Sequence, residues 1–117
     1  MAKQPAPKAT VIDIGVKGDA IDVPATSNVQ SGGTLNWKSS LGPWVVVFDG
    51  DKPPSSQGPF HDNDRERRPG DGKSRDVRKH AKATTYKYSV ALYHEKRQKV
   101  YLADPEVIVD PAASSET

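Results

Sequence analysis

Residues 86–92 read Tyr-Lys-Tyr-Ser-Val-Ala-Leu, and this stretch decides the fold class. Large apolar side chains stand at every second position, and polar or small residues stand between them. Because successive side chains of a β-strand point to opposite faces of a sheet, the alternation predicts a strand with one buried face. Residues 44–48 read Trp-Val-Val-Val-Phe between Pro43 and Gly50, and this short β-branched run favours a central strand.

Shorter stretches with the same period of two recur along the chain. They lie at residues 12–16, 21–25 and 34–37, and two last short strands are expected at 100–102 and 106–109. About seven short strands separated by Gly and Pro turns are typical of an antiparallel β-sandwich. The inward positions of these strands predict a single core that contains Trp37, Val46, Phe48, Tyr88, Val90, Leu92 and Ile108.

The composition indicates one modest domain. The chain has 117 residues, 34% of them hydrophobic, with 9 glycines and 10 prolines. No apolar run approaches the roughly 20 residues of a membrane helix, and the N-terminus has no apolar signal region. We therefore expect no membrane partner and, by default, a cytoplasmic location, although a trimmed exported protein would have the same features.

The chain divides into a sandwich and three less regular segments. We expect a sandwich at residues 11–110, a flexible N-terminal tail at 1–10 and a flexible C-terminal tail at 111–117. Residues 49–83 interrupt the strand rhythm with Pro, Gly and charged residues. This long excursion has few apolar groups, so we expect much of it to lie outside the core and to be more mobile than the strands.

Four stretches resemble strands of the cupredoxin family, the fold of the blue-copper proteins. Residues 31–37 (Ser-Gly-Gly-Thr-Leu-Asn-Trp) resemble its turn and Trp-containing strand, and residues 44–48 resemble its His-Thr-Val-Thr-Phe strand. Residues 85–88 (Thr-Tyr-Lys-Tyr) and 104–109 (Asp-Pro-Glu-Val-Ile-Val) resemble two later strands. The resemblance covers residues 12–109 and implies an antiparallel Greek-key β-sandwich, cupredoxin-like, with residues 49–83 as a long charged insertion.

At most one of the copper ligands of that family has a counterpart here. The first His would fall near Trp44, the Cys near Val90, and the second His at Tyr93 or His94. The chain has no Cys, and its only Met is Met1. A blue-copper centre needs a thiolate, so the resemblance implies the fold without the copper, and we predict no cofactor.

Other chemistry is weakly supported by the sequence. His61 with Asp62 and Asp64, or His94 with Glu95, could bind a metal, but neither set has ligand spacing, so ordinary surface histidines are favoured. Neither a phosphate-binding loop nor a nucleophilic Ser elbow is present. We therefore predict that the protein is not an enzyme.

Residues 65–82 form the most basic segment, with eight Lys or Arg against three acids. They are either a solvated loop, which we favour, or a contact for nucleic acid or another polyanion. The candidate contact residues are Arg65, Arg67, Arg68, Arg75, Arg78 and Lys79. Trp44 is either a core residue or, if exposed at the rim of the sandwich, a recognition hot spot.

These observations favour a metal-free, cupredoxin-like domain that acts as a protein-binding or accessory module for an unidentified protein partner. The alternative is nucleic-acid or polyanion binding through residues 65–82, which we expect to be weak because the rest of the chain is net acidic. A steep loss of affinity with salt would distinguish polyanion binding from protein binding. The sequence carries no signature of an oligomeric state.

Overall fold

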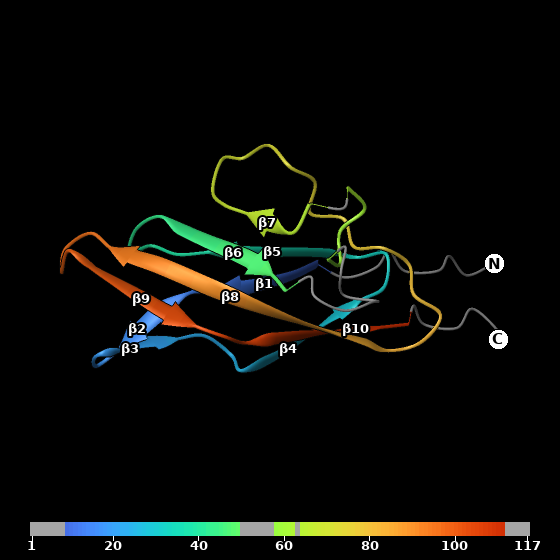
Figure 1. Ribbon diagram of the computed structural model, residues 1–117, viewed down its shortest axis with the longest axis horizontal. Coiled ribbons are helices and arrows are strands. Elements are labelled where there is room, and N and C mark those ends of the chain that lie inside the picture. The colour runs from blue at the N-terminus through green and yellow to red at the C-terminus, as the bar shows by residue number, and fades with distance from the viewer. Residues whose placement is uncertain (1–8, 50–57, 63, 112–117) are drawn as a thin grey trace, which may run out of the picture.

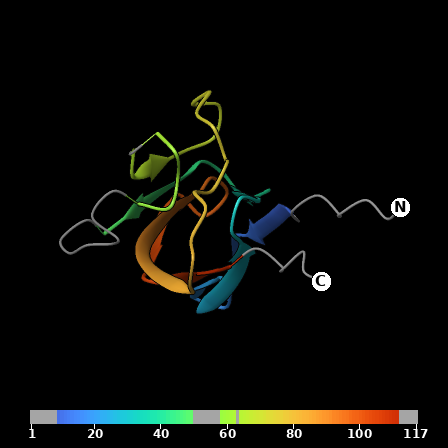
Figure 2. The ribbon, with the colours of Figure 1, turned by 90° about the vertical axis from the view of Figure 1, so that its right-hand side faces the viewer.

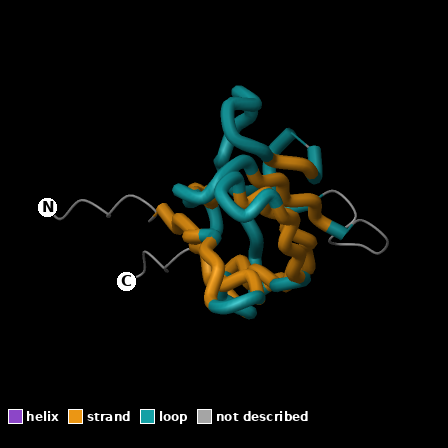
Figure 3. Tube along the Cα trace, turned by 90° about the vertical axis from the view of Figure 1, so that its left-hand side faces the viewer, coloured by secondary structure: helices purple, strands orange, loops and turns teal. Residues whose placement is uncertain are grey.

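The computed structural model describes residues 9–49, 58–62 and 64–111. Within these residues the chain is all-β, with strands and loops and no helix (Figure 3). The ten strands are β1 (Ala9–Asp13), β2 (Gly15–Lys17), β3 (Ala20–Asp22), β4 (Thr26–Gln30), β5 (Thr34–Lys38), β6 (Trp44–Phe48), β7 (Glu66–Arg67), β8 (Thr84–His94), β9 (Lys99–Ala103) and β10 (Glu106–Asp110). No helix in the described part of the chain is long and apolar enough to cross a membrane.

The strands form one large sheet, a β1–β5 pair and a β2–β3 hairpin (Figure 1). The large sheet has the order β4-β10-β8-β6-β7, and β9 also pairs with β8. The sheets are mixed, because β1 runs parallel to β5 and β4 runs parallel to β10. The expectation of a purely antiparallel arrangement is therefore wrong. A parallel pair needs a crossover connection, and residues 14–33 supply one between β1 and β5.

Strand β8 is the centre of the large sheet. Its first half pairs with β10, and its residues 88–92 pair with β6. Its last five residues also pair with β9 on the other side. This strand contains the alternating stretch that predicted the fold, and Tyr86, Tyr88, Val90 and Leu92 are all buried.

One hydrophobic core lies between the strands, which surround it when the molecule is viewed end on (Figure 2). Six of the seven predicted core residues belong to it: Trp37, Val46, Phe48, Tyr88, Val90 and Leu92. The seventh, Ile108, is only half-buried, whereas its neighbours Val107 and Val109 are fully buried. Side chains alternate along a strand, so an error of one residue assigns the wrong face. The prediction of Ile108 as a core residue is therefore wrong, and Val107 and Val109 are the core residues of β10.

Part of the long excursion contributes to the core. Phe60, Arg67 and Val77 have no exposed surface. Strand β7 pairs with the middle of β6, and an isolated bridge joins Phe60 to Val77. The loop after β7 stands above the sheets (Figure 2). The expected mobility of the excursion rests partly on residues 50–57 and 63, which lie outside the described residues.

The sandwich begins earlier than the sequence predicted. Ala9 and Thr10 belong to β1, so they are not part of a tail. At the other end, β10 closes at Asp110 and Pro111 is exposed. The remaining predicted tail residues, 1–8 and 112–117, lie outside the described residues.

Candidate protein-binding surface

The basic segment is held together by its own hydrogen bonds, and Arg67 is their centre. Its guanidinium carbon lies 4.0 Å from the centre of the Phe60 ring, and its Nη2 donates to both carboxylate oxygens of Asp62 at 2.9 Å. The remaining nitrogens donate to the carbonyl oxygens of Asp64, Glu66 and Ser74. Arg67 is fully buried with its donors satisfied, so it is unable to contact a polyanion.

Arg75 is also a structural residue. Its Nε donates to Asn36 Oδ1 at 2.9 Å, and its Nη1 pairs with Asp71 Oδ1 at 3.1 Å. Burial raises the pKa of Asp71, but N–H donors from Arg68 and Lys73 and the charge of Arg75 outweigh it, so the pKa is lowered. The carboxylate therefore stays ionised and tethers the loop to β5.

The other candidate contacts differ in exposure. Arg68 pairs with Glu66 and keeps an exposed guanidinium, and Arg65 is exposed beside the carbonyl of Phe48. Arg78 is half-buried and donates to the carbonyl oxygen of Gly58, while Lys79 is exposed. The structure therefore does not bring the six predicted residues together as one exposed basic patch.

Trp44 is a core residue, and the alternative of an exposed hot spot is wrong. Its side chain is 7% exposed, and its ring centre lies 6.1 Å from that of Trp37. Together with Pro43 it forms a ridge between two hollows, which share these two residues in their walls. We call it the Pro43–Trp44 ridge.

The ridge is fixed to the end of β8. The Tyr93 N–H donates to the Pro43 carbonyl at 2.9 Å, and the Glu95 N–H donates to the Leu41 carbonyl at 3.0 Å. A side chain at Gly42 would collide with the Tyr93 carbonyl oxygen. Glycine is therefore required for the β5–β6 connection to approach β8 this closely.

The first hollow, which we call the apolar hollow, has a volume of about 310 Å³. Cross-strand pairing builds its floor, because Ala91 on β8 lies opposite Val45 on β6, and Tyr93 lies opposite Val100 on β9. The small Ala91 side chain leaves a depression between its larger neighbours. Its lining is Pro43, Trp44, Val45, Arg68, Ala91, Tyr93 and Val100.

The apolar hollow belongs to a wider apolar surface of the large sheet. We call this surface the outer apolar face: Val45, Val47, Ala91, Tyr93, Val100 and Leu102. Leu102 lies opposite Ala91 and is 72% exposed, which is the greatest exposure among the large hydrophobic residues described. The alternating strands therefore carry apolar side chains on their solvent face as well as on their core face. The unbroken apolar run of residues 44–48 is the sequence signal of this second apolar face.

The second hollow lies on the other side of the ridge and has a volume of about 450 Å³. We call it the polar hollow. Its lining combines the two tryptophans with Lys38 and Arg75 and with neutral side chains. Lys38 is exposed and lies 3.8 Å from Asp13, whereas the Arg75 side chain is mostly buried.

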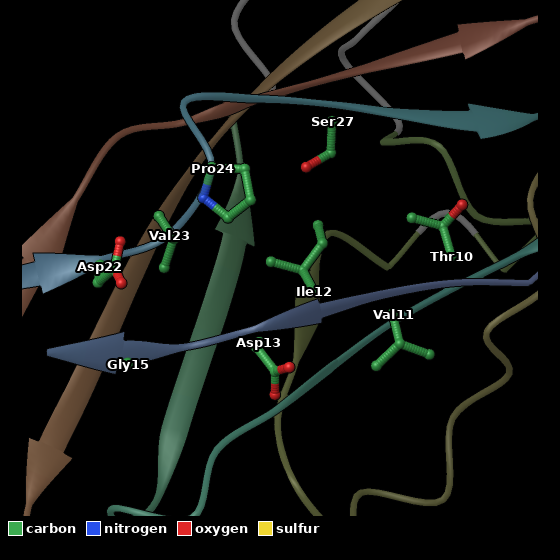
Figure 4. A pocket seen from close by; sticks show the side chains of 9 residues that line it. All are labelled: Thr10, Val11, Ile12, Asp13, Gly15, Asp22, Val23, Pro24 and Ser27. Carbon is green, nitrogen blue, oxygen red and sulfur yellow. The ribbon is translucent and has the colours of Figure 1, made fainter.

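A third hollow, the β1 groove, has a different character. It separates β1 from the connection between β3 and β4 and has a volume of about 430 Å³. Figure 4 shows Thr10 and Ile12 pointing into the space below Ser27, with Asp13 and Asp22 at the β2–β3 end. The Thr10 hydroxyl bridges the groove by donating to the Asn28 carbonyl at 3.1 Å.

Of the positions that would hold copper in the resembled family, only the one at His94 has a copper-binding side chain. Val90 and Trp44 are in the core, and His94 is buried with its ring centre 6.3 Å from that of Tyr101. His61 is exposed. Among the described residues, no three His, Asp or Glu side chains are placed so that they could hold a metal ion.

Comparison of the chain with models of protein families, with curated proteins and with solved structures finds no match in any of the three. The proposal of a function therefore rests on the geometry of the surface.

Proposed function

We propose that this chain is a protein-binding module and not an enzyme, and that it works without a metal or other cofactor. The outer apolar face is the observation that carries the proposal. Contiguous apolar surface on a folded domain marks an interaction site, whereas scattered apolar residues need no explanation. Here the apolar residues lie on three neighbouring strands and surround a hollow.

The energetics favour a partner over solvent. Full burial of a Leu or Val side chain stabilises a complex by about 1.5–3 kcal/mol. Leu102 and Val100 are more than half exposed, so most of this stabilisation is not yet realised in the free protein. Interfaces obtain most of their affinity from a few anchor residues in a desolvated centre, and Tyr is one of the residue types enriched among them. Leu102 and Tyr93 are the proposed anchors.

We also propose that the fold is a Greek-key, cupredoxin-like sandwich. One support is the placement of an early strand, β4, beside the last strand, β10, so that segments far apart in the sequence share one sheet. The order of the resembling stretches along the chain is the second support. A fold of this kind hosts many functions, so the surface and not the fold carries the functional argument.

Polyanion binding through residues 65–82 is the weaker alternative. Arg67 is buried and Arg75 is tied to Asp71, so two of the six proposed contacts are engaged inside the protein. Lys73 pairs with Asp64, and Arg68 pairs with Glu66. Heparin or DNA binding that falls steeply with salt and is lost in Lys79→Glu would support this alternative.

The proposed function is tested by capture of a partner from the native host with three baits: wild type, Leu102→Asp and Val11→Asp. Val11 is the matched control, because it is 53% exposed and stands on β1, outside the outer apolar face. We expect wild type and Val11→Asp to retain the same protein and Leu102→Asp to lose it. Equal capture by all three baits would contradict the proposal.

A further inference from the structure

The two hollows beside the Pro43–Trp44 ridge share a charge property that the β1 groove and a fourth hollow lack. Their described linings contain the cations Lys38, Arg68 and Arg75 and no carboxylate. The β1 groove is lined by Asp13 and Asp22, and a fourth hollow is lined by Asp62, Asp64 and Glu66 together with Arg65. The ridge is therefore the one of these sites where apolar and cationic groups meet without an acid in the wall.

Arg68 is the cation best placed to meet a ligand. Its side chain is 59% exposed and lines the apolar hollow. Its Nη2 lies 2.5 Å from Glu66 Oε2, and no other residue of the described part of the chain is given as a partner of its Nε or Nη1. A guanidinium has five N–H donors, so one ion pair leaves donors for a second carboxylate.

The main chain of Arg68 is fixed before any ligand arrives. Its N–H donates to Asp71 Oδ2 at 2.8 Å, and its carbonyl accepts from Arg75 Nη2 at 3.2 Å. The residue that precedes it, Arg67, is buried and lies in β7, which pairs with β6 of the large sheet. Arg68 is thus presented by a rigid base, and such pre-organisation lowers the entropic cost of binding.

We propose that the ridge binds a segment of the protein partner that carries an apolar side chain next to an aspartate or glutamate. The proposal rests on the proposed function and specifies the partner's chemistry. The apolar side chain enters the apolar hollow over Ala91, and the carboxylate pairs with Arg68. The volume of 310 Å³ is at the lower end of ligand pockets, about 300–1,000 Å³, which suits one or two side chains of a peptide.

The test uses a library of random linear peptides displayed on phage and selected against the folded wild-type protein at low salt. We expect enrichment of sequences in which Asp or Glu adjoins Leu, Ile, Phe or Trp. Binding of the most enriched synthetic peptide is then followed by tryptophan fluorescence. The chain has two tryptophans, and Trp44 lines both hollows whereas Trp37 lines only the polar hollow, so Trp44 reports on the site directly.

Charge reversal at Arg68 tests the proposed ion pair. Arg68→Glu should weaken the peptide at least about tenfold, or ~1.4 kcal/mol. Arg65→Glu is the matched control, because Arg65 is exposed in the same segment but lines neither hollow, and it should change the affinity less than about twofold. A peptide whose acid is replaced by its amide should bind the wild type more weakly, and Arg68→Glu should weaken it no further.

The outcomes separate the inference from the proposed function. Selected peptides without acids, or equal effects of the two reversals, overturn the inference. The proposed function survives that result if Leu102→Asp still abolishes binding. If Leu102→Asp and Ala91→Trp both leave binding unchanged, the proposed function fails as well. Failure to enrich any peptide, or concentration-dependent dimers that Leu102→Asp abolishes, also overturns the inference.

Discussion

Arg67 and Phe60 form a cation–π pair inside the core: the guanidinium carbon lies 4.0 Å from the ring centre, and neither side chain has exposed surface. Their pairing joins the start of the described excursion to β7 and so to the large sheet. Arg67, which the sequence predicts as a basic contact residue, is therefore one of the groups that hold the excursion in place.

Replacement of Arg67 should lower the stability of the folded protein. We expect Arg67→Ala to lower the free energy of unfolding by about 3–5 kcal/mol, because Asp62 loses its buried partner and three carbonyl oxygens lose their donor. Arg65→Ala, at an exposed position, should change it by less than about 0.5 kcal/mol. Urea denaturation measures both, and equal small effects would show that Arg67 is not a structural residue.

The acids of the excursion should make stability depend on acidic pH. The pKa of Asp64 lies below its usual 3.8, because the Lys73 ammonium and the Glu66 N–H bind the carboxylate and outweigh the effect of burial. In Asp62 burial raises the pKa, but hydrogen bonds from Arg67 and from the Asp64 N–H lower it by more. Their stabilisation is therefore present at neutral pH and is lost as pH falls below 3.8 through the folded-state pKa values.

The Asp64→Asn variant tests this dependence. Its deficit in unfolding free energy relative to wild type should be present at neutral pH and should shrink as the solution is acidified below 3.8. Asp22→Asn serves as the control, because the structure gives the Asp22 carboxylate no partner among the described residues. A deficit that stays constant from neutral to acidic pH would contradict the assignment.

Tyr86 and His80 form a partly buried hydrogen bond whose contribution to stability should be measurable. His80 Nδ1 faces the Arg78 carbonyl, which only accepts, so Nδ1 carries the hydrogen and Nε2 accepts from the Tyr86 hydroxyl at 2.7 Å. Burial raises the pKa of Tyr86, although the charge of Arg78 opposes the shift. Tyr86→Phe should cost about 1 kcal/mol in thermal or urea unfolding. No change in stability would show that the hydroxyl is satisfied elsewhere.

The register of β10 can be tested by two substitutions that shorten a side chain to alanine. Val109 is fully buried and Ile108 is half-buried, so Val109→Ala should cost about 2 kcal/mol, more than Ile108→Ala although fewer atoms are removed. The alternating pattern had assigned Ile108 to the core. A larger loss for Ile108→Ala would restore that assignment and contradict the structure.

Local alternation predicted the strands well, because a period of two is a property of a single segment. It identified residues 86–92 as a strand and placed Trp37, Phe48 and Val90 in the core. The parallel partners β1–β5 and β4–β10 are separated by long connections, and nothing local encodes them. Residues 106–109 are apolar at three successive positions, so the sequence alone does not decide which of them face the core. Their pairing with β8 decides it.

The site was harder to predict than the fold. Charge density alone indicates a solvated segment, and it does not reveal that Asp62 and Phe60 will enclose Arg67. The outer apolar face did leave a signal, since Val47, Tyr93 and Leu102 occupy outward positions of otherwise regular strands. Several apolar residues at outward positions of neighbouring strands are the pattern that indicates a binding surface.

The central claim is that partners bind over the outer apolar face, and site-specific photo-crosslinking tests it most directly. Benzoylphenylalanine replaces Val100 on that face, Val11 on β1, or Lys79 in the basic segment, and each protein is irradiated with extract of the native host. The account predicts one discrete adduct from position 100, competed by unlabelled wild type and absent from positions 11 and 79. Adducts from position 79 or 11 without one from position 100 would contradict it.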